Sequence, residues 1–219
     1  MQPLFRTILF VLFFAFHSGS FGQPFINEIK AFRKADSLKA PADKVILLIG
    51  SSSFTNWKDV ASYFPDQTII NRGFGGSSLP HLIMYAEDVI FKYNPKQIII
   101  YCGENDLTGG ASITADTIFE RVKNLHRLIR SKFKKVPIAY ISMKPSPSRE
   151  KYLPTMEKAN DMIKSFMEKK KKSAFIDVYH SMFDAEGKIM SNIFLADKLH
   201  MNADGYKIWK GVIEPYLVK

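Results

Sequence analysis

Cysteine is almost absent from this sequence, since Cys102 is the only one among 219 residues. A single cysteine cannot form an internal disulfide, so a hydrophobic core must hold the fold together. Because Cys102 ends an apolar run, we interpret it as a buried small hydrophobic residue and not as a reactive thiol. Zinc-ligand spacings, recognition-helix signatures and basic motifs interleaved with aromatics are also missing. These absences argue against a metal site and against nucleic acid as a partner.

Long apolar runs are missing too, except at the N-terminus. Arg6 precedes an almost entirely apolar stretch from Ile8 to Phe16, and Ser20-Phe21-Gly22 offers small residues before a cleavage site. The apolar stretch is short for a membrane span. We therefore predict a signal peptide over residues 1–22, with an uncleaved N-terminal anchor as the alternative. Because no cysteine follows directly, we expect no lipid anchor, no stable membrane insertion after cleavage, and a periplasmic or secreted location.

The rest of the chain, residues 23–219, is long enough for one domain that buries about 70% of its unfolded surface. Acidic residues are outnumbered by basic ones, 21 to 31, which gives a formal charge of +10, or +9 without Arg6. Such a charge attracts anionic glycans, lipid head groups and nucleic acid alike, so it does not indicate which of them is the partner. The densest basic run, Lys169 to Lys172, follows a helical pattern and is interpreted as a solvated helix end.

Apolar runs of strand length alternate with helical patterns along the chain. The runs predict strands at residues 45–49, 68–71, 97–102, 136–142 and 173–177. Helices are expected at 25–38, 79–92, 114–133 and 202–214, with a further one around Met156 to Phe166. The third of these carries an apolar stripe with a 3.6-residue period, Ile118, Val122, Leu125 and Ile129. The alternation predicts an α/β fold with a parallel sheet covered on both faces.

Three serines, Ser51-Ser52-Ser53, follow the first predicted strand, where its carboxyl end opens into a loop. Ligands and chemistry gather at this edge of open α/β sheets. Ser52 could act as a nucleophile if a base, an orienting group and oxyanion donors lie nearby. Serines also cap helices and form turns, which is the simpler alternative. Phe54 replaces the second glycine of the Gly-x-Ser-x-Gly elbow, which disfavours an α/β-hydrolase fold.

Four histidines follow residue 22, namely His81, His126, His180 and His200. The last two each have an aspartate three residues earlier, Asp177 and Asp197. Asp177 lies at a strand end, where three residues advance by about 10 Å, so we expect no carboxylate–imidazole bond to His180. Asp197 and His200 precede a helix, and there the two side chains can meet. This reasoning favours His200 as the base, with His81 and His126 as surface or packing residues.

Two further polar loops follow predicted strands. Asn105 and Asp106 come directly after the third strand, where a turn with side-chain capping is the alternative explanation. The loop Gly73-Phe74-Gly75-Gly76 follows the second strand and lacks the last glycine of a dinucleotide-binding motif, because Ser78 stands there. Its glycines let the backbone approach a substrate closely or form a turn. All these loops are expected at one edge of the sheet.

Taken together, four stretches resemble the sequence blocks of the SGNH (GDSL-type) hydrolases in their order and spacing. They are Gly50-Ser51-Ser52, Gly76 within Asn71 to Ser77, Gly103-Glu104-Asn105-Asp106, and Asp197-Lys198-Leu199-His200. The resemblance implies a flavodoxin-like three-layer α/β/α sandwich with strand order 2-1-3-4-5. It also implies Ser52 as nucleophile, His200 as base, Asp197 as its orienter, and an oxyanion hole from the Ser52 and Gly76 N–H groups and the Asn105 amide. No cofactor or metal is implied. Ser51 departs from the family, which has an aspartate there.

The expected function is therefore an exported serine esterase that acts on short acyl esters. A carbohydrate O-acetyl ester is the first substrate we consider, and a lysophospholipid or other lipid ester the second. A non-catalytic glycan-binding module on the same fold is the alternative from another class. A flavin or nucleotide carrier would need a phosphate-binding loop, which the sequence lacks.

Overall fold

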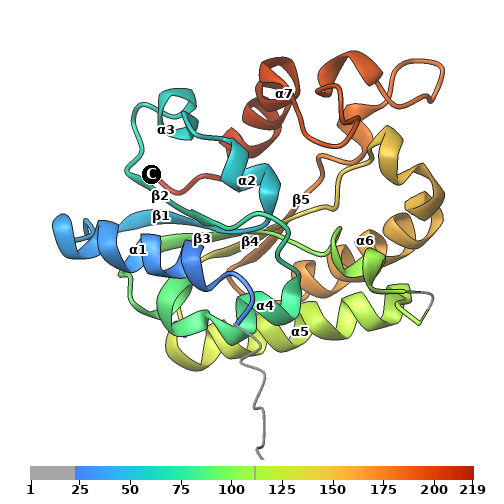
Figure 1. Ribbon diagram of the computed structural model, residues 1–219. Helices are drawn as coiled ribbons and strands as arrows, with labels where there is room; N and C mark the ends of the chain where they lie inside the picture. The colour runs from blue at the N-terminus through green and yellow to red at the C-terminus, as the bar shows by residue number, and fades with distance from the viewer. Residues whose placement is uncertain (1–22, 111) are drawn as a thin grey trace, which may run out of the picture.

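Five parallel strands form the central sheet of the computed structural model, which describes residues 23–110 and 112–219. Their order across the sheet is β2-β1-β3-β4-β5, as expected (Figure 1). The strands are β1 (Val45–Gly50), β2 (Ile69–Gly73), β3 (Pro95–Tyr101), β4 (Ile138–Ile141) and β5 (Ser173–Ile176). The predicted signal peptide, residues 1–22, lies outside the described residues.

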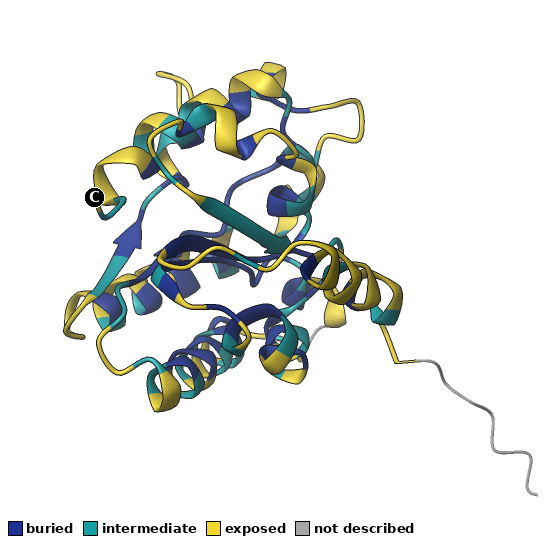
Figure 2. Cartoon of the chain, turned by 90° about the vertical axis from the view of Figure 1, so that its left-hand side faces the viewer, coloured by how far each residue is buried: buried dark blue, intermediate teal, exposed yellow. Residues whose placement is uncertain are grey.

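Burial on both faces explains why the inner strands are continuous apolar runs. Every residue of β1 is buried. Val45, Leu47 and Ile49 pack into the core on one face of the sheet, and Ile46 and Leu48 pack into the core on the other. Successive side chains of a strand point to opposite faces of the sheet. A parallel strand between two helical layers therefore needs apolar residues at every position. Figure 2 shows the edge strand β2 mainly in teal in front of dark blue inner strands, between helices that expose their outer faces.

Helices cover both faces of the sheet and complete the three layers. On one face lie α1 (Ile26–Leu38), α4 (Leu79–Met84), α5 (Ala115–Lys132) and α6 (Leu153–Glu168). On the other lie α2 (Ser52–Asn56), α3 (Val60–Tyr63) and α7 (Ala203–Ile213), drawn above the sheet in Figure 1. None of the helices in the described ranges is long and apolar enough to cross a membrane.

The longest helix, α5, confirms its predicted stripe. Its four apolar stripe residues are buried, and Thr114 caps its first turn by accepting a hydrogen bond from the Thr117 N–H. Lys169 to Lys172 follow α6 and are exposed, as expected for a solvated helix end. Cys102 is buried, which also agrees with the sequence.

Two local departures from the sequence prediction concern short helices. The serine stretch was expected to open into a loop, but α2 begins there at Ser52 and α3 follows shortly after. Helices this short do not complete enough turns to display a periodic pattern. The helix expected over residues 79–92 is divided into α4 and a π-helical turn, Glu87–Phe91. Apolar spacing over one or two turns does not distinguish these geometries.

The end of β1 is held close to β3 at the carboxyl edge of the sheet. Gly50 has a φ of 152°, and a Cβ added there would lie 1.9 Å from the Tyr101 carbonyl oxygen. That carbonyl accepts a hydrogen bond from the Ser51 N–H at 3.0 Å. Only glycine fits this approach. The serine stretch therefore starts from a fixed point next to the loop that carries Asn105.

Candidate active site

Of the three serines after β1, only Ser52 is accessible. Ser51 and Ser53 are 3% and 2% exposed, whereas Ser52 is half-buried. Ser52 is the first residue of α2, so its N–H has no acceptor within the helix. Ser52 thus offers both an accessible hydroxyl and a backbone N–H without an acceptor in the helix. A serine that attacks an ester and also donates to the oxyanion needs both groups.

Asp197 and His200 form a hydrogen-bonded pair in the loop before α7. The His200 Nδ1 lies 2.6 Å from the Asp197 Oδ2, and Oδ1 accepts the N–H groups of Leu199 and His200 at 2.9 Å each. The imidazole bond, followed by the two backbone N–H bonds, lowers the pKa of Asp197 to about 2. With the proton of a neutral imidazole on Nδ1, Nε2 is left to accept a proton.

The expectation that Asp177 and His180 do not bond is wrong. The His180 Nδ1 lies 2.8 Å from the Asp177 Oδ2, and its N–H donates to Oδ1 at 3.2 Å. The strand ends at Ile176, and a short 3₁₀ helix begins at His180. The chain thus turns instead of continuing extended, which brings the third residue back to the carboxylate. Two aspartate–histidine pairs therefore have the same local geometry.

Position in the fold separates these two pairs. Asp177 follows β5, the edge strand, three strand spacings or about 14 Å across the sheet from β1. The loop of His200 leads into α7, where the Tyr206 hydroxyl donates to the Ser53 carbonyl at 2.8 Å. The His180 side chain is 67% exposed and that of His200 only 24%. His200 is thus the partly enclosed histidine whose helix is tied to the serine stretch.

Asn105 lies beside the serine stretch, as the sequence predicts. Its Nδ2 donates to the Ser51 Oγ at 2.7 Å and to the Ser77 carbonyl at 3.0 Å. Gly76 has a φ of 79°, which favours glycine, and its N–H has no acceptor among the described residues. Within residues 23–110 and 112–219, no hydrogen bond joins Ser52 to His200. Such bonds are often long before substrate binds and tighten in the complex.

A buried ion pair under these loops was not predicted. Lys144 is only 1% exposed and lies 3.1 Å from the Glu104 Oε2, which also accepts the Tyr101 hydroxyl at 2.6 Å. Burial, and then the Glu104 charge, raise the pKa of Tyr101 well above its usual value. Pattern analysis misses Lys144 because a lysine in a proline-rich loop is usually exposed.

A second ionic contact anchors the Asn105 loop from the other side. The Asp106 side chain is fully buried, and it accepts the Arg121 Nη1 at 2.6 Å and the Leu79 N–H at 3.0 Å. Burial raises the pKa of Asp106 against the opposing effect of these partners. Asp106 thus joins the N-terminus of α4 to the middle of α5.

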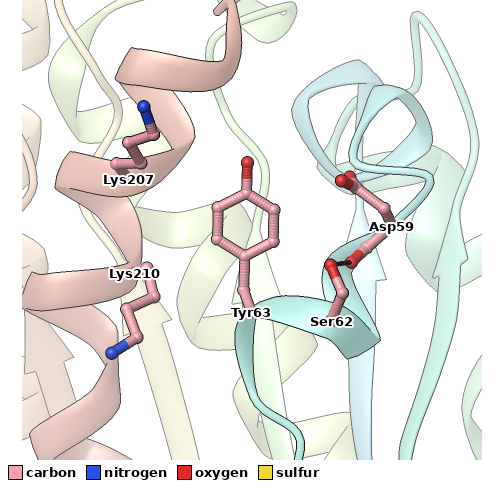
Figure 3. A pocket seen from close by; sticks show the side chains of 5 residues that line it. All are labelled: Asp59, Ser62, Tyr63, Lys207 and Lys210. Carbon is pink, nitrogen blue, oxygen red and sulfur yellow. Dashed lines mark hydrogen bonds between the residues drawn. The ribbon is translucent and has the colours of Figure 1, made fainter.

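Two cavities of about 490 Å³ each lie in different parts of the protein. One adjoins the candidate site and is lined by Gly76, Asn105, His81 and Arg121, among others. The other lies between α3 and α7, where Tyr63 stands between two lysines and Asp59 (Figure 3). Those lysines, Lys207 and Lys210, pair with carboxylates of α7 and its C-terminal cap. No cluster of three or more metal-ligating side chains occurs among the described residues.

The remaining two histidines also have clear environments. His126 is 7% exposed, packs against Phe166 and lies 3.0 Å from the Ser173 Oγ through Nε2. Burial lowers its pKa to about 4. This confirms the packing role. His81 caps α4 through Ser78 and lies at the cavity beside Gly76, which the sequence did not indicate.

Comparison with known proteins agrees with this geometry. No curated protein matches the sequence. Solved structures with this fold include a GDSL-like lipase from Bacteroides thetaiotaomicron (TM-score 0.71, 20% identity, 86% of this chain and 96% of that one). A lipase/acylhydrolase from Enterococcus faecalis is also similar (TM-score 0.63, 18% identity, 79% of this chain and 94% of that one). So is a variant of an acetyl-xylooligosaccharide esterase from Geobacillus (TM-score 0.63, 15% identity, 82% of this chain and 97% of that one). The sequence profile of the GDSL-like lipase/acylhydrolase family matches residues 36–208, and the chain belongs to that family.

Proposed function

We propose that this acylhydrolase is a serine esterase in which Ser52 is the nucleophile, His200 the base and Asp197 its orienting group. The observation that carries the proposal is the 2.6 Å bond between the His200 Nδ1 and the Asp197 carboxylate. It fixes the tautomer in which Nε2 accepts the Ser52 proton, and it stabilises the imidazolium that forms.

The reaction proceeds through an acyl-enzyme on Ser52. As Oγ attacks the ester carbonyl, its proton passes to the His200 Nε2, and the carbonyl oxygen becomes an oxyanion. The donors to this oxyanion are the N–H groups of Ser52 and Gly76, each typically worth about 3 kcal/mol. The Asn105 amide joins them by releasing one of its two present acceptors, the Ser51 Oγ or the Ser77 carbonyl. His200 then protonates the departing alcohol. A water activated by His200 hydrolyses the acyl-enzyme and releases the carboxylic acid.

For the substrate, we propose a short acyl ester, with a carbohydrate O-acetyl ester as the first candidate. The solved acetyl-xylooligosaccharide esterase has the same fold, and the basic surface suits acidic polysaccharides. We further propose that the N-terminal segment directs export, so that the enzyme works in the periplasm or outside the cell. N-terminal sequencing of the secreted protein tests this, and a start at Gln23 is expected.

A fluorophosphonate probe, followed by intact-mass analysis and peptide mapping, tests the nucleophile. We expect a single adduct on Ser52 that disappears in Ser52→Ala. An unlabelled protein, under conditions that label a control serine hydrolase, would instead favour a glycan-binding module.

The two aspartate–histidine pairs provide a matched control for the base. His200→Ala should lower kcat on 4-nitrophenyl acetate by at least about 10³-fold, since the serine loses its general base. His180→Ala removes the same side chain from the same kind of pair and should leave kcat unchanged. The opposite pattern would reject His200 as the base.

A further inference from the structure

The cavity beside Gly76 and Asn105 is positioned to receive one part of an ester bound at the candidate site. Gly76 and Asn105 supply two of the proposed oxyanion donors and also line this cavity of about 490 Å³. Its other walls come from α4 and α5, through His81 and Arg121. A group attached to the reacting carbonyl can therefore enter the cavity directly.

The topology indicates which part of the ester this is, provided that the proposed function holds. His200 precedes α7, which covers one face of the sheet, and it must lie beside the departing alcohol to protonate it. The cavity is lined by His81 of α4, Arg121 of α5 and the loops after β2 and β3. Both helices cover the other face of the sheet (Figure 1). The acyl group lies across the carbonyl from the alcohol, so it is the acyl group that extends towards the cavity.

His81 offers this cavity a hydrogen-bond donor. Its Nδ1 accepts the Ser78 N–H at 3.1 Å and lies 2.8 Å from the Ser78 hydroxyl. Because a backbone N–H can only donate, Nδ1 is unprotonated and the ring proton is on Nε2. Nε2 has no partner within the described part of the chain. The ring is held by Phe25, whose centroid lies 4.7 Å away in an edge-to-face arrangement.

Arg121, from α5, offers the cavity further donors. Its Nη1 is bound to the fully buried Asp106, which fixes the guanidinium in place. Nε and Nη2 make no hydrogen bond to the described residues, and the side chain is 30% exposed. Both oxygens of Asp106 already accept hydrogen bonds, from Arg121 and from the Leu79 N–H. The cavity thus presents fixed donors, while its carboxylate is already engaged.

We propose that this cavity is an acyl-binding subsite that selects acyl groups ending in a carboxylate, bound by Arg121 and His81. An arginine fork held by a buried partner matches a carboxylate geometrically, and a second donor completes its coordination. Among acyl groups larger than acetyl, a purely aliphatic chain that enters the cavity would leave these donors unpaired and is disfavoured for that reason. Within that set, the preferred esters are half-esters of short dicarboxylic acids.

The test compares ethyl esters, so that the departing alcohol is always ethanol. Monoethyl succinate is compared with ethyl 4-methylpentanoate, in which two methyl groups replace the carboxylate oxygens, and with ethyl acetate. We expect kcat/KM for monoethyl succinate to exceed that of its neutral isostere by at least about tenfold, the effect of one charged hydrogen bond. A ratio of one or less would overturn the proposal.

Arg121→Gln should reduce this ratio by about tenfold, because the amide can still bond to Asp106 but carries no charge. Arg127→Gln makes the same exchange on the same helix at an exposed arginine, whose one hydrogen-bond partner among the described residues is Asn124, and should not change the ratio. His81→Phe keeps the ring against Phe25, removes the Nε2 donor, and should also reduce the ratio. An unchanged ratio in both Arg121→Gln and His81→Phe would overturn the subsite.

The rate of ethyl acetate hydrolysis and the Ser52 adduct distinguish failure of the acyl-binding subsite from failure of the proposed esterase activity. Hydrolysis of ethyl acetate without a preference for succinate would reject the subsite and retain the esterase. Absence of hydrolysis of all three esters, with no adduct on Ser52, would reject both.

Discussion

At the scale of single residues, Ser51 shows how a departure from the family is accommodated. Its buried Oγ accepts a hydrogen bond from the Asn105 amide at 2.7 Å, and its carbonyl accepts the N–H groups of Phe54 and Thr55 in α2. A hydroxyl thus provides the acceptor next to Asn105 without adding a buried negative charge. Asn105 is oriented by two acceptors, the Ser51 Oγ and the Ser77 carbonyl, and both belong to loops that carry proposed oxyanion donors.

The lowered pKa of Asp197 leads to a prediction about how kcat/KM depends on pH. Its pKa is lowered from 3.8 to about 2, so the carboxylate stays charged, and its bond to His200 is retained, until the pH falls towards 2. A loss of kcat/KM between pH 7 and 4 would therefore not be due to protonation of Asp197. Asp197→Asn should lower kcat by about 10³- to 10⁴-fold across this range, because the amide no longer holds the correct tautomer.

The equivalent change in the second pair, Asp177→Asn, serves as the control for that pH profile. Asp177 accepts the same two bonds from its own histidine, but that histidine is largely exposed beyond the edge strand. Its profile of kcat/KM against pH should superimpose on that of the unmodified enzyme. Equal losses in both variants would show that the carboxylates act on folding and not on catalysis.

The same two pairs show what residue patterns could and could not predict. Spacing identified both aspartate–histidine pairs, and the choice of His200 agrees with its enclosure next to α7. The reason given against His180 was wrong, because it assumed that the strand continued through Asp177. Whether a chain turns after a strand depends on local hydrogen bonds that hydrophobic periodicity does not contain.

At the scale of elements, the loop after β4 connects the two halves of the candidate site. Lys144 in this loop binds Glu104, next to Asn105. The Ser148 N–H donates to the carbonyl of Lys198, two residues before His200. Lys144→Met would remove the only basic side chain that pairs with the buried Glu104 among the described residues, while the Tyr101 hydroxyl would stay bonded to it. We expect this to reduce the free energy of unfolding by about 3–5 kcal/mol, measured by urea denaturation.

Combining Lys144→Met with Glu104→Gln tests whether that loss arises from the unpaired charge. Removing both charges should recover most of the stability, so the two substitutions should be strongly non-additive. Additive losses would mean that the two side chains stabilise the protein independently. The exposed pair Lys158–Asp116 is a suitable reference, because Lys158→Met should cost less than about 1 kcal/mol.

Predictability also differed between elements. The sheet and its order followed from five apolar runs separated by helical patterns, because strands buried on both faces must be apolar throughout. The short helices α2 and α3 were missed, and so was the burial of Lys144. The burial of Lys144 depends on a tertiary contact, its bonds to Glu104. The sequence around a lysine does not indicate whether the fold provides such a partner.

At the scale of the whole molecule, the sheet divides the proposed substrate between its two faces. The helix after His200 packs on one face, and α4 and α5, which carry His81 and Arg121, pack on the other. Between them, at the carboxyl edge, lie Ser52, Gly76 and Asn105. In the proposed enzyme, separate helical layers therefore contact the alcohol and the acyl group. The layer of α4 and α5 does not contain Ser52, so it can change the acyl preference without moving the nucleophile.

The net positive charge of the protein predicts a salt dependence of kcat/KM that differs from the effect of Arg121 at the cavity. With 31 basic and 21 acidic residues in the full chain, the surface field attracts anions, and salt screens it over about 10 Å at 0.1 M. We expect kcat/KM for monoethyl succinate to fall several-fold between 10 and 300 mM NaCl, whereas that for ethyl 4-methylpentanoate stays constant. Arg121→Gln should lower the first value at every salt concentration but retain most of its salt dependence, because one charge contributes little to the total field. If Arg121→Gln abolished the salt dependence, attraction would arise at the cavity alone and the net charge would have no part in substrate capture.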